Sequence, residues 1–201
     1  MTKRLKAAER RASILAVAKI LFADKGYHGV SVDEISARLG VSPAVLYQHF
    51  PSKEALYEAV LANISEKRDS FVSAVLDGNQ DFAGVLKRMT HVFISSIAHD
   101  PDYLKMEILS ALEGADAAKR FFENRWRSFA DYIEFNLKEL TQEKKVDPVN
   151  PKVASLMFQG MIREALYDTC IVKTERYREL KLEPLVDQLV ELFLRAINYR
   201  P

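Results

Sequence analysis

Apolar residues recur along most of this chain every three to four positions, the spacing that puts them on one face of an α-helix. Near the beginning, Ile14, Ala18 and Phe22 share such a face, and similar stripes return in longer segments up to the last residues. No segment of useful length alternates apolar and polar positions, as a half-buried β-strand would. The pattern therefore predicts an all-α fold.

Capping residues, glycines and prolines divide this pattern into helices. We expect helices at residues 6–24, 31–39, 43–50, 52–76, 82–98, 115–140, 151–174 and 184–199, with a shorter one after Asp100. Asp100-Pro101 and Asn150-Pro151 each provide an N-cap residue followed by proline at the first helical position. The sequence predicts a three-helix N-terminal domain at residues 1–52 and a larger helical domain at residues 53–201.

Residues 31–53, SVDEISARLGVSPAVLYQHFPSK, form the most informative block of the sequence. A capping box from Ser31 to Glu34 opens one short helix, and Ser42 followed by Pro43 opens another. Gly40 supplies the positive φ that the turn between them needs. Two short helices joined by a glycine-containing turn are the layout of a DNA-reading helix-turn-helix.

The two faces of this block have different chemistry. The inner face carries Ile35, Leu39, Val41, Leu46 and Phe50, and the outer face carries Pro43, Ala44, Tyr47 and Gln48. Small side chains at the start of the second helix allow close approach to base edges, where Ala44 or the Pro43 ring can contact a thymine methyl group and Gln48 can pair with adenine. The outer face is therefore predicted to read a major groove.

Residues 26–56, GYHGVSVDEISARLGVSPAVLYQHFPSKEAL, resemble the DNA-binding domain of the TetR (tetracycline repressor) family. The shared features are the Gly-Val-Ser turn, the Leu-Tyr-x-x-Phe helix and the following lysine, and the resemblance covers about the first 60 residues. It implies phosphate contacts for Ser31, Tyr47, His49 and Lys53, and base-proximal positions for Arg38, Pro43, Ala44 and Gln48. The predicted DNA-binding set, with the cap residue included, is Ser31, Arg38, Ser42, Pro43, Ala44, Tyr47, Gln48, His49 and Lys53. Many members carry Lys, Arg or Gly where this chain has Pro43 and Ala44, so DNA shape should contribute to recognition.

The charge distribution agrees with a DNA-binding N-terminus. Residues 1–55 hold nine Lys and Arg against five Asp and Glu, a net +4, whereas the rest of the chain holds 20 against 23, a net −3. A positive end on a mildly acidic body favours contact with a polyanion. A non-specific DNA-architectural protein, the first alternative, is usually basic throughout.

The last two predicted helices are candidates for dimerisation. The final helix is apolar on more than one face, through Leu185, Val186, Leu189, Val190, Leu192, Phe193, Leu194, Ala196 and Ile197. A helix on the outside of a monomer shows a single stripe. These helices are therefore expected to form a four-helix bundle across a two-fold axis, as the resemblance also implies. The alternative is burial within one chain.

The larger domain is expected to bind a small, largely apolar effector between its helices. Candidate pocket residues are His91, Met106, Phe122, Trp126, Tyr132, Met157, Phe158, Met161 and Tyr167, and the alternative for each is ordinary core packing. The resemblance implies a repressor of transcription that an effector releases from palindromic operator DNA by a shift of conformational population. The helix beginning at Lys53 would act as its lever.

Other activities find little support in the sequence. The four histidines are scattered and form no metal-ligand cluster, and no nucleophile elbow, P-loop or dinucleotide fingerprint occurs. We expect no metal, cofactor or enzymatic activity, with an all-helical enzyme kept as the second alternative. No apolar run approaches the roughly 18 residues of a membrane span, which favours a cytoplasmic location.

Overall fold

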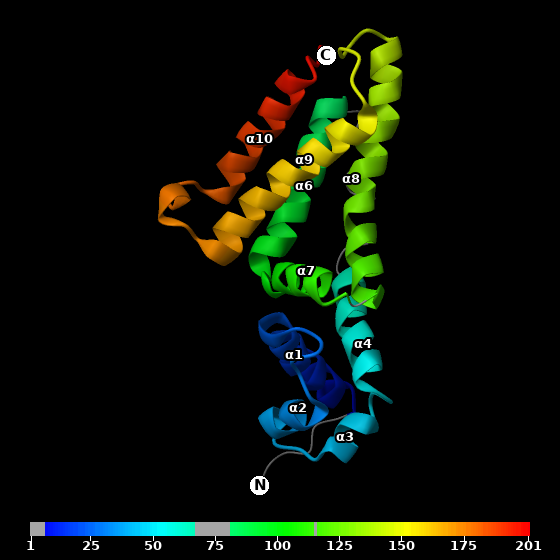
Figure 1. The fold of residues 1–201 in the computed structure, drawn as a ribbon, viewed down its shortest axis with the longest axis vertical. Helices are drawn as coiled ribbons and strands as arrows, with labels where there is room; N and C mark the ends of the chain where they lie inside the picture. Colours follow the sequence, from blue (N-terminus) through cyan, green and yellow to red (C-terminus); the bar gives the residue numbers. More distant parts are fainter. Residues whose placement is uncertain (1–6, 67–80, 115) are drawn as a thin grey trace. The chain divides into compact units, whose positions relative to one another are not determined.

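The computed structural model describes residues 7–66, 81–114 and 116–201. Throughout these ranges the regular structure is helical and contains no strand, which confirms the all-α prediction (Figure 1). The helices group into two compact units, one from residues 1–68 and 102–122 and the other from residues 69–101 and 123–201. None of the described helices is both long enough and apolar enough to cross a membrane.

The first unit contains α1 (Ala7–Lys25), α2 (Val32–Leu39), α3 (Pro43–Tyr47), α4 (Lys53–Glu66) and α7 (Asp102–Glu113). The central helix is α1, which packs against α2, α4 and α7. Its predicted apolar face is buried, with Ile14, Ala18 and Phe22 inaccessible to solvent. The helix ends where Gly26 adopts a φ of 73°, a left-handed conformation that glycine adopts at the lowest cost.

The second unit contains α6 (Phe82–His99), α8 (Asp116–Gln142) from Glu123 onward, α9 (Pro151–Tyr167), the π-helical turn η1 (Asp168–Val172), the 3-10 turn η2 (Glu175–Tyr177) and α10 (Leu182–Ala196). A row of aromatic contacts joins its four long helices. The ring centroids of Phe93 and Phe129 lie 5.2 Å apart, those of Phe129 and Phe158 5.9 Å, and those of Phe158 and Phe193 4.9 Å. Such spacings suit offset or edge-on aromatic packing, so these rings hold α6, α8, α9 and α10 around one core.

Two helix boundaries differ from the predicted ones near a proline. α3 ends at Tyr47 and not at Phe50, because the residue before Pro51 is disfavoured in helical backbone. Phe50 instead turns its ring into the core of the first unit. Asp100 is the C-terminal cap of α6, not the N-cap of the next helix, which begins at Asp102.

The C-terminal part also shows features that periodicity did not predict. The helix expected at residues 151–174 is α-helical only to Tyr167 and continues as the π-helical turn η1. It stops where Lys173 takes a left-handed φ of 54°. Of the helix expected at residues 52–76, the structure describes the part up to Glu66, and the remainder lies outside the described residues.

The first compact unit extends beyond the predicted domain boundary after residue 52. Both α4 and α7 pack on α1, so the helix-turn-helix shares its core with two helices that follow residue 52 in the sequence. The division of function at residue 52 remains a prediction, while the core itself includes residues up to Phe122.

Candidate nucleic-acid interface

The predicted caps of the helix-turn-helix are present in the structure. Ser31 Oγ accepts a hydrogen bond from the backbone N–H of Glu34 at 3.1 Å, which begins α2. Gly40 ends α2 with φ 65° and ψ 36°, and its N–H donates to the carbonyl of Ala37 at 3.1 Å. Local capping chemistry therefore fixes the turn between α2 and α3.

The predicted inner face packs as a small core beneath α3. Ile35, Leu46 and Phe50 are buried, and Leu39 and Val41 are partly buried against the same cluster. The packing of all five apolar side chains fixes which way α3 faces, because its remaining side chains must point away from the core.

The outer face of α3 is open to solvent. Ala44 and Gln48 are exposed, and Tyr47 is exposed over 52% of its surface. Pro43 is half-buried at the first position of the helix, and the side chain of Ser42 makes no capping hydrogen bond to it. An exposed aromatic ring beside an exposed amide provides one stacking or hydrogen-bonding group and one group that can read a base edge.

The remaining predicted DNA contacts lie close to this face in the sequence. Ser31 and Arg38, at the two ends of α2, are exposed, and His49 is half-buried just after α3. The Glu34 carboxylate, which would repel a phosphate, forms an ion pair with Lys25 of α1. Because Glu34 pairs with Lys25, it neutralises less of the positive charge of Arg38, which lies four residues further along α2.

Lys53 has a structural role that the sequence did not indicate. Its Nζ donates hydrogen bonds to the carbonyl oxygens of Tyr27 at 2.9 Å and Val30 at 3.0 Å. The same ammonium group lies 4.3 Å from the centroid of the Tyr27 ring. Because an ammonium group has three N–H donors, one remains for the predicted phosphate contact, and the other two hold the turn between α1 and α2.

The nine predicted pocket residues divide between the two units. Met106 and Phe122 are buried in the core of the first unit. The other seven belong to the second unit: His91, Trp126, Tyr132, Met157, Phe158, Met161 and Tyr167. Trp126 and Phe158 are buried there, whereas Met157 and Tyr167 are 40% and 38% exposed.

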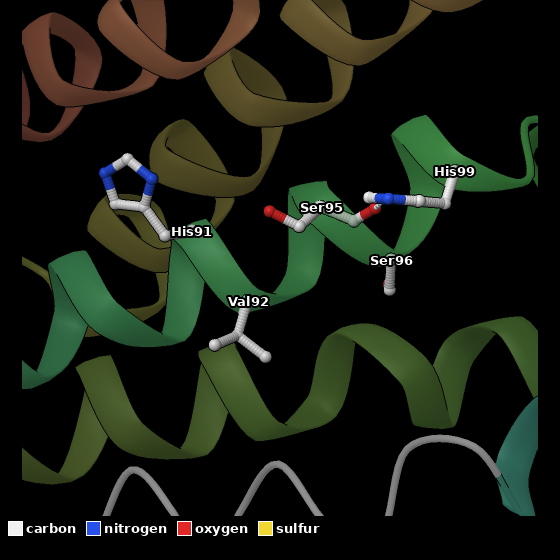
Figure 2. A pocket seen from close by; sticks show the side chains of 5 residues that line it. All are labelled: His91, Val92, Ser95, Ser96 and His99. Atoms are coloured by element: carbon white, nitrogen blue, oxygen red, sulfur yellow. Dashed lines mark hydrogen bonds between the residues drawn. The ribbon is translucent and has the colours of Figure 1, made fainter.

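His91 lines an open groove of about 310 Å³ along α6, together with Val92, Ser95, Ser96 and His99 (Figure 2). A sequence signal for this groove exists, because polar side chains recur every four residues along one face of α6, at His91, Ser95 and His99. The Nε2 of His91 lies 2.6 Å from Oδ1 of Asp187 on α10. The groove wall therefore includes a polar link between α6 and α10.

Lys87 completes this link, because its Nζ lies 3.0 Å from the same Asp187 oxygen. The hydrogen bond from His91, followed by that from Lys87, lowers the pKa of the Asp187 carboxyl below its ordinary value. An ionised Asp187 thus joins two basic groups of α6 to α10.

The outward face of α9 is unusually apolar. Val153, Leu156 and Met157 are 59%, 70% and 40% exposed, and Leu192 of α10 is 54% exposed. Gly160 lies on the same helix with no atom near the position a Cβ would occupy. The spacing of Val153, Leu156 and Met157 gives α9 an exposed apolar stripe on its outward side.

Comparisons with known proteins agree with this geometry. Residues 14–60 match the model of the bacterial regulatory proteins of the tetR family. The HTH-type transcriptional activator FasR of Mycolicibacterium smegmatis is 42% identical over 97 residues, which cover 48% of this chain and 44% of FasR. The nucleoid occlusion factor SlmA of Vibrio campbellii is 25% identical over 167 residues, covering 80% of this chain and 84% of SlmA.

Among solved structures, AibR in complex with isovaleryl coenzyme A and operator DNA superposes with a TM-score of 0.70. It is 24% identical, and the match covers 96% of this chain and 100% of AibR, which supports a common fold over nearly the whole length. The family match coincides with the capped turn, the buried inner face and the exposed outer face of α3. Residues 14–60 are therefore a DNA-binding domain of the type found in the tetR family of bacterial regulatory proteins, and the rest of the chain shares its helical fold with AibR.

Proposed function

We propose that this protein binds a specific operator as a homodimer and represses transcription until a small apolar effector releases it from the DNA. The observation that carries the proposal is the exposed surface of Ala44, Tyr47 and Gln48 on a helix whose opposite side is buried. A protein that bound DNA only through its charge would not need this fixed, nearly uncharged reading surface.

Recognition of the DNA sequence would depend on α3. Gln48 can donate to and accept from adenine in the major groove, and Ala44 can contact a thymine methyl group. Tyr47, with Ser31 at the start of α2, would hold the sugar-phosphate backbone and fix the register, while Arg38 at the end of α2 would lie near the bases. Few polar base contacts are available, so sequence-dependent DNA shape should add to specificity.

Dimerisation would use the apolar outward face of α9 and the exposed side of α10. The side chains of Val153, Leu156 and Leu192 would leave water on association, and Gly160 would allow two helices to approach closely. Two helices from each subunit form a four-helix bundle about a two-fold axis. The pair would then present two copies of α3 to half-sites about 34–36 Å apart.

The effector would bind between the helices of the larger predicted domain, residues 53–201. AibR is solved with isovaleryl coenzyme A, whose acyl group is small and apolar although its nucleotide part is large and anionic. Acyl-coenzyme A thioesters and the corresponding free acyl compounds are therefore the first two classes to test here. The effector would favour a conformation in which the two α3 helices no longer match the operator spacing, and its effect is limited to the difference in its affinity for the two conformations. Binding to chromosomal DNA implies action in the cytoplasm.

Fluorescence anisotropy with labelled duplexes from the region upstream of the protein's own gene tests the proposal. Gln48→Ala should lower affinity for the preferred duplex by about 5- to 100-fold and leave affinity for random duplex unchanged. Tyr47→Phe, which removes only the hydroxyl, should lose less than Tyr47→Ala. Leu180→Ala, an exposed change far along the chain, is the control. Equal affinity of the wild type for upstream and random duplexes would instead favour an architectural DNA-binding protein.

A further inference from the structure

The helix α7 belongs to the first unit, which also holds α2 and α3, although it follows a segment of the second unit in the sequence. It follows α6 and precedes the part of α8 from Glu123 onward, both of which belong to the second unit. Nevertheless, α7 packs on α1 in the first unit. Since the segments on both sides belong to the second unit, a conformational change there reaches α7 through the covalent chain.

Ion pairs fix α7 along α1. Lys105 Nζ lies 3.3 Å from Asp24 Oδ1 on α1 and 3.4 Å from Asp102 Oδ1 on its own helix. Asp102 in turn lies 3.5 Å from Nζ of Lys19 on α1. These partly exposed pairs contribute little energy individually, but together they define the position of α7 relative to α1.

Glu113, in the last turn of α7, contacts the turn that follows α1. Its Oε2 accepts the backbone N–H of Tyr27 at 2.8 Å, and its Oε1 accepts that of His28 at 3.4 Å. A carboxylate is disfavoured at the C-terminal end of its own helix, so these N–H groups are what stabilise it there. Any side chain at Gly26 would occupy this space, because a Cβ would meet Oε1 at 2.0 Å.

The same turn is held from its other side by α4. The carbonyl oxygens of Tyr27 and Val30 accept hydrogen bonds from Lys53, and the Tyr27 ring packs edge-on against Tyr57 with centroids 5.1 Å apart. Burial, with the nearby Glu113 charge as a smaller contribution, raises the pKa of Tyr57 to about 12. The backbone of Tyr27 is thus bound on its N–H side by α7 and on its carbonyl side by α4.

We propose that Glu113 is a positioning residue that couples the second half of the chain to the DNA-reading helices through the turn at residues 26–30. This turn leads directly into Ser31, the N-cap of α2. While α7 holds it, α2 and α3 keep the orientation that fits the operator. Withdrawal of Glu113 frees one side of the turn and lowers operator affinity. The inference rests on the proposed function, because operator binding is its readout.

Glu113→Gln in the full-length protein tests this coupling, because the change removes the charge and keeps the size of the side chain. Hydrogen exchange followed by mass spectrometry should show about fivefold faster exchange at residues 27 and 28, the difference between a charge-assisted and a neutral hydrogen bond. Operator affinity should fall several-fold, while affinity for random duplex is retained. Glu113→Asp, which keeps the charge and shortens the side chain, serves if Glu113→Gln does not fold.

A variant of matched stability separates coupling from simple destabilisation. Val60→Ala, in the buried part of α4, weakens the same core, keeps the hydrogen bonds of Glu113 and Lys53 to the turn, and should keep wild-type operator affinity. Wild-type affinity in Glu113→Gln, or an equal loss in Val60→Ala, would overturn the coupling alone. Absence of operator preference in the wild type would overturn the proposed function and this inference together.

Discussion

Replacement of Lys53 by methionine should destabilise the first unit. If Lys53 only contacted phosphate, the replacement would leave the stability of this unit unchanged. Methionine has nearly the length of lysine but no donor, so the carbonyl groups of Tyr27 and Val30 each lose a hydrogen bond. At about 1 kcal/mol for each bond and about 0.5 kcal/mol for the cation–π contact, the loss is about 2–3 kcal/mol. The half-buried position of Lys53 favours the lower end of this range.

Two measurements distinguish the two roles of Lys53. Urea unfolding followed by circular dichroism, at one fixed protein concentration because the protein is proposed to dimerise, gives the free energy of unfolding. The salt dependence of operator binding shows how many phosphates the protein neutralises, and its slope should fall by about one when a single phosphate-binding side chain is removed. Lys53→Arg keeps the charge and is the control for the slope.

The stability measurement decides whether Lys53 holds the turn. A loss of about 2 kcal/mol leaves most molecules folded in a protein of ordinary stability, so DNA binding of Lys53→Met remains measurable. If Lys53→Met unfolds at the same urea concentration as the wild type, the two hydrogen bonds to the carbonyl groups contribute nothing and the argument that α4 holds this turn is refuted.

Three further predictions concern the second unit. Leu156→Asp places a charge on the proposed dimer face and should give a folded monomer in analytical ultracentrifugation. Phe158→Ala removes a fully buried ring and should lower the free energy of unfolding by about 3–5 kcal/mol in urea denaturation. Asp187→Asn should lower the urea midpoint at neutral pH, because hydrogen bonds from His91 and Lys87 hold the pKa of the Asp187 carboxyl below its ordinary value. A pKa depressed by folding stabilises the protein fully above the unfolded-state pKa, so the difference between wild type and Asp187→Asn should shrink as the pH falls below that value and vanish below the pKa of the folded protein.

Each of these changes has a matched control or a contradicting outcome. Leu112→Asp, at an 80% exposed position of α7, should leave the dimer intact, and a dimeric Leu156→Asp would remove α9 from the interface. Phe135→Ala, at a 62% exposed position, should change stability by less than about 0.5 kcal/mol. A pH-independent difference for Asp187→Asn would show that packing, and not the ion pairs, accounts for its effect.

Local signals in the sequence were sufficient for the helix-turn-helix. The cap at Ser31 and the left-handed Gly40 depend on residues within four positions of each other, so the sequence carries their full explanation. The inner face of α3 follows from the same helical spacing, and Leu46 and Phe50 are buried as predicted. The exposed outer face then follows by exclusion.

Contacts between distant positions were not available to the same reasoning. Lys53 lies 26 positions from Tyr27, and Glu113 lies 86 positions from it. Neither hydrophobic pattern nor helix propensity specifies which distant side chain will bind the backbone of Tyr27. The same limit applies to the predicted pocket. Met106 and Trp126 have similar apolar surroundings in the sequence, yet one packs in the first unit and the other in the second.

The position of α7 shows that the compact units of this chain are not separated by a single point in the sequence. Polar and proline residues at the helix ends predict a domain boundary near residue 52. The core of the first unit nevertheless includes the apolar side chains of Met106 and Phe122. A truncated protein ending near residue 66 would therefore expose part of the α1 surface that α7 covers. The second half of the chain thus supplies part of the core beneath α2 and α3, and the proposed coupling uses this shared core. Under the proposed coupling, an effector would act by changing how firmly α7, and with it Glu113, is held against the turn that leads into α2.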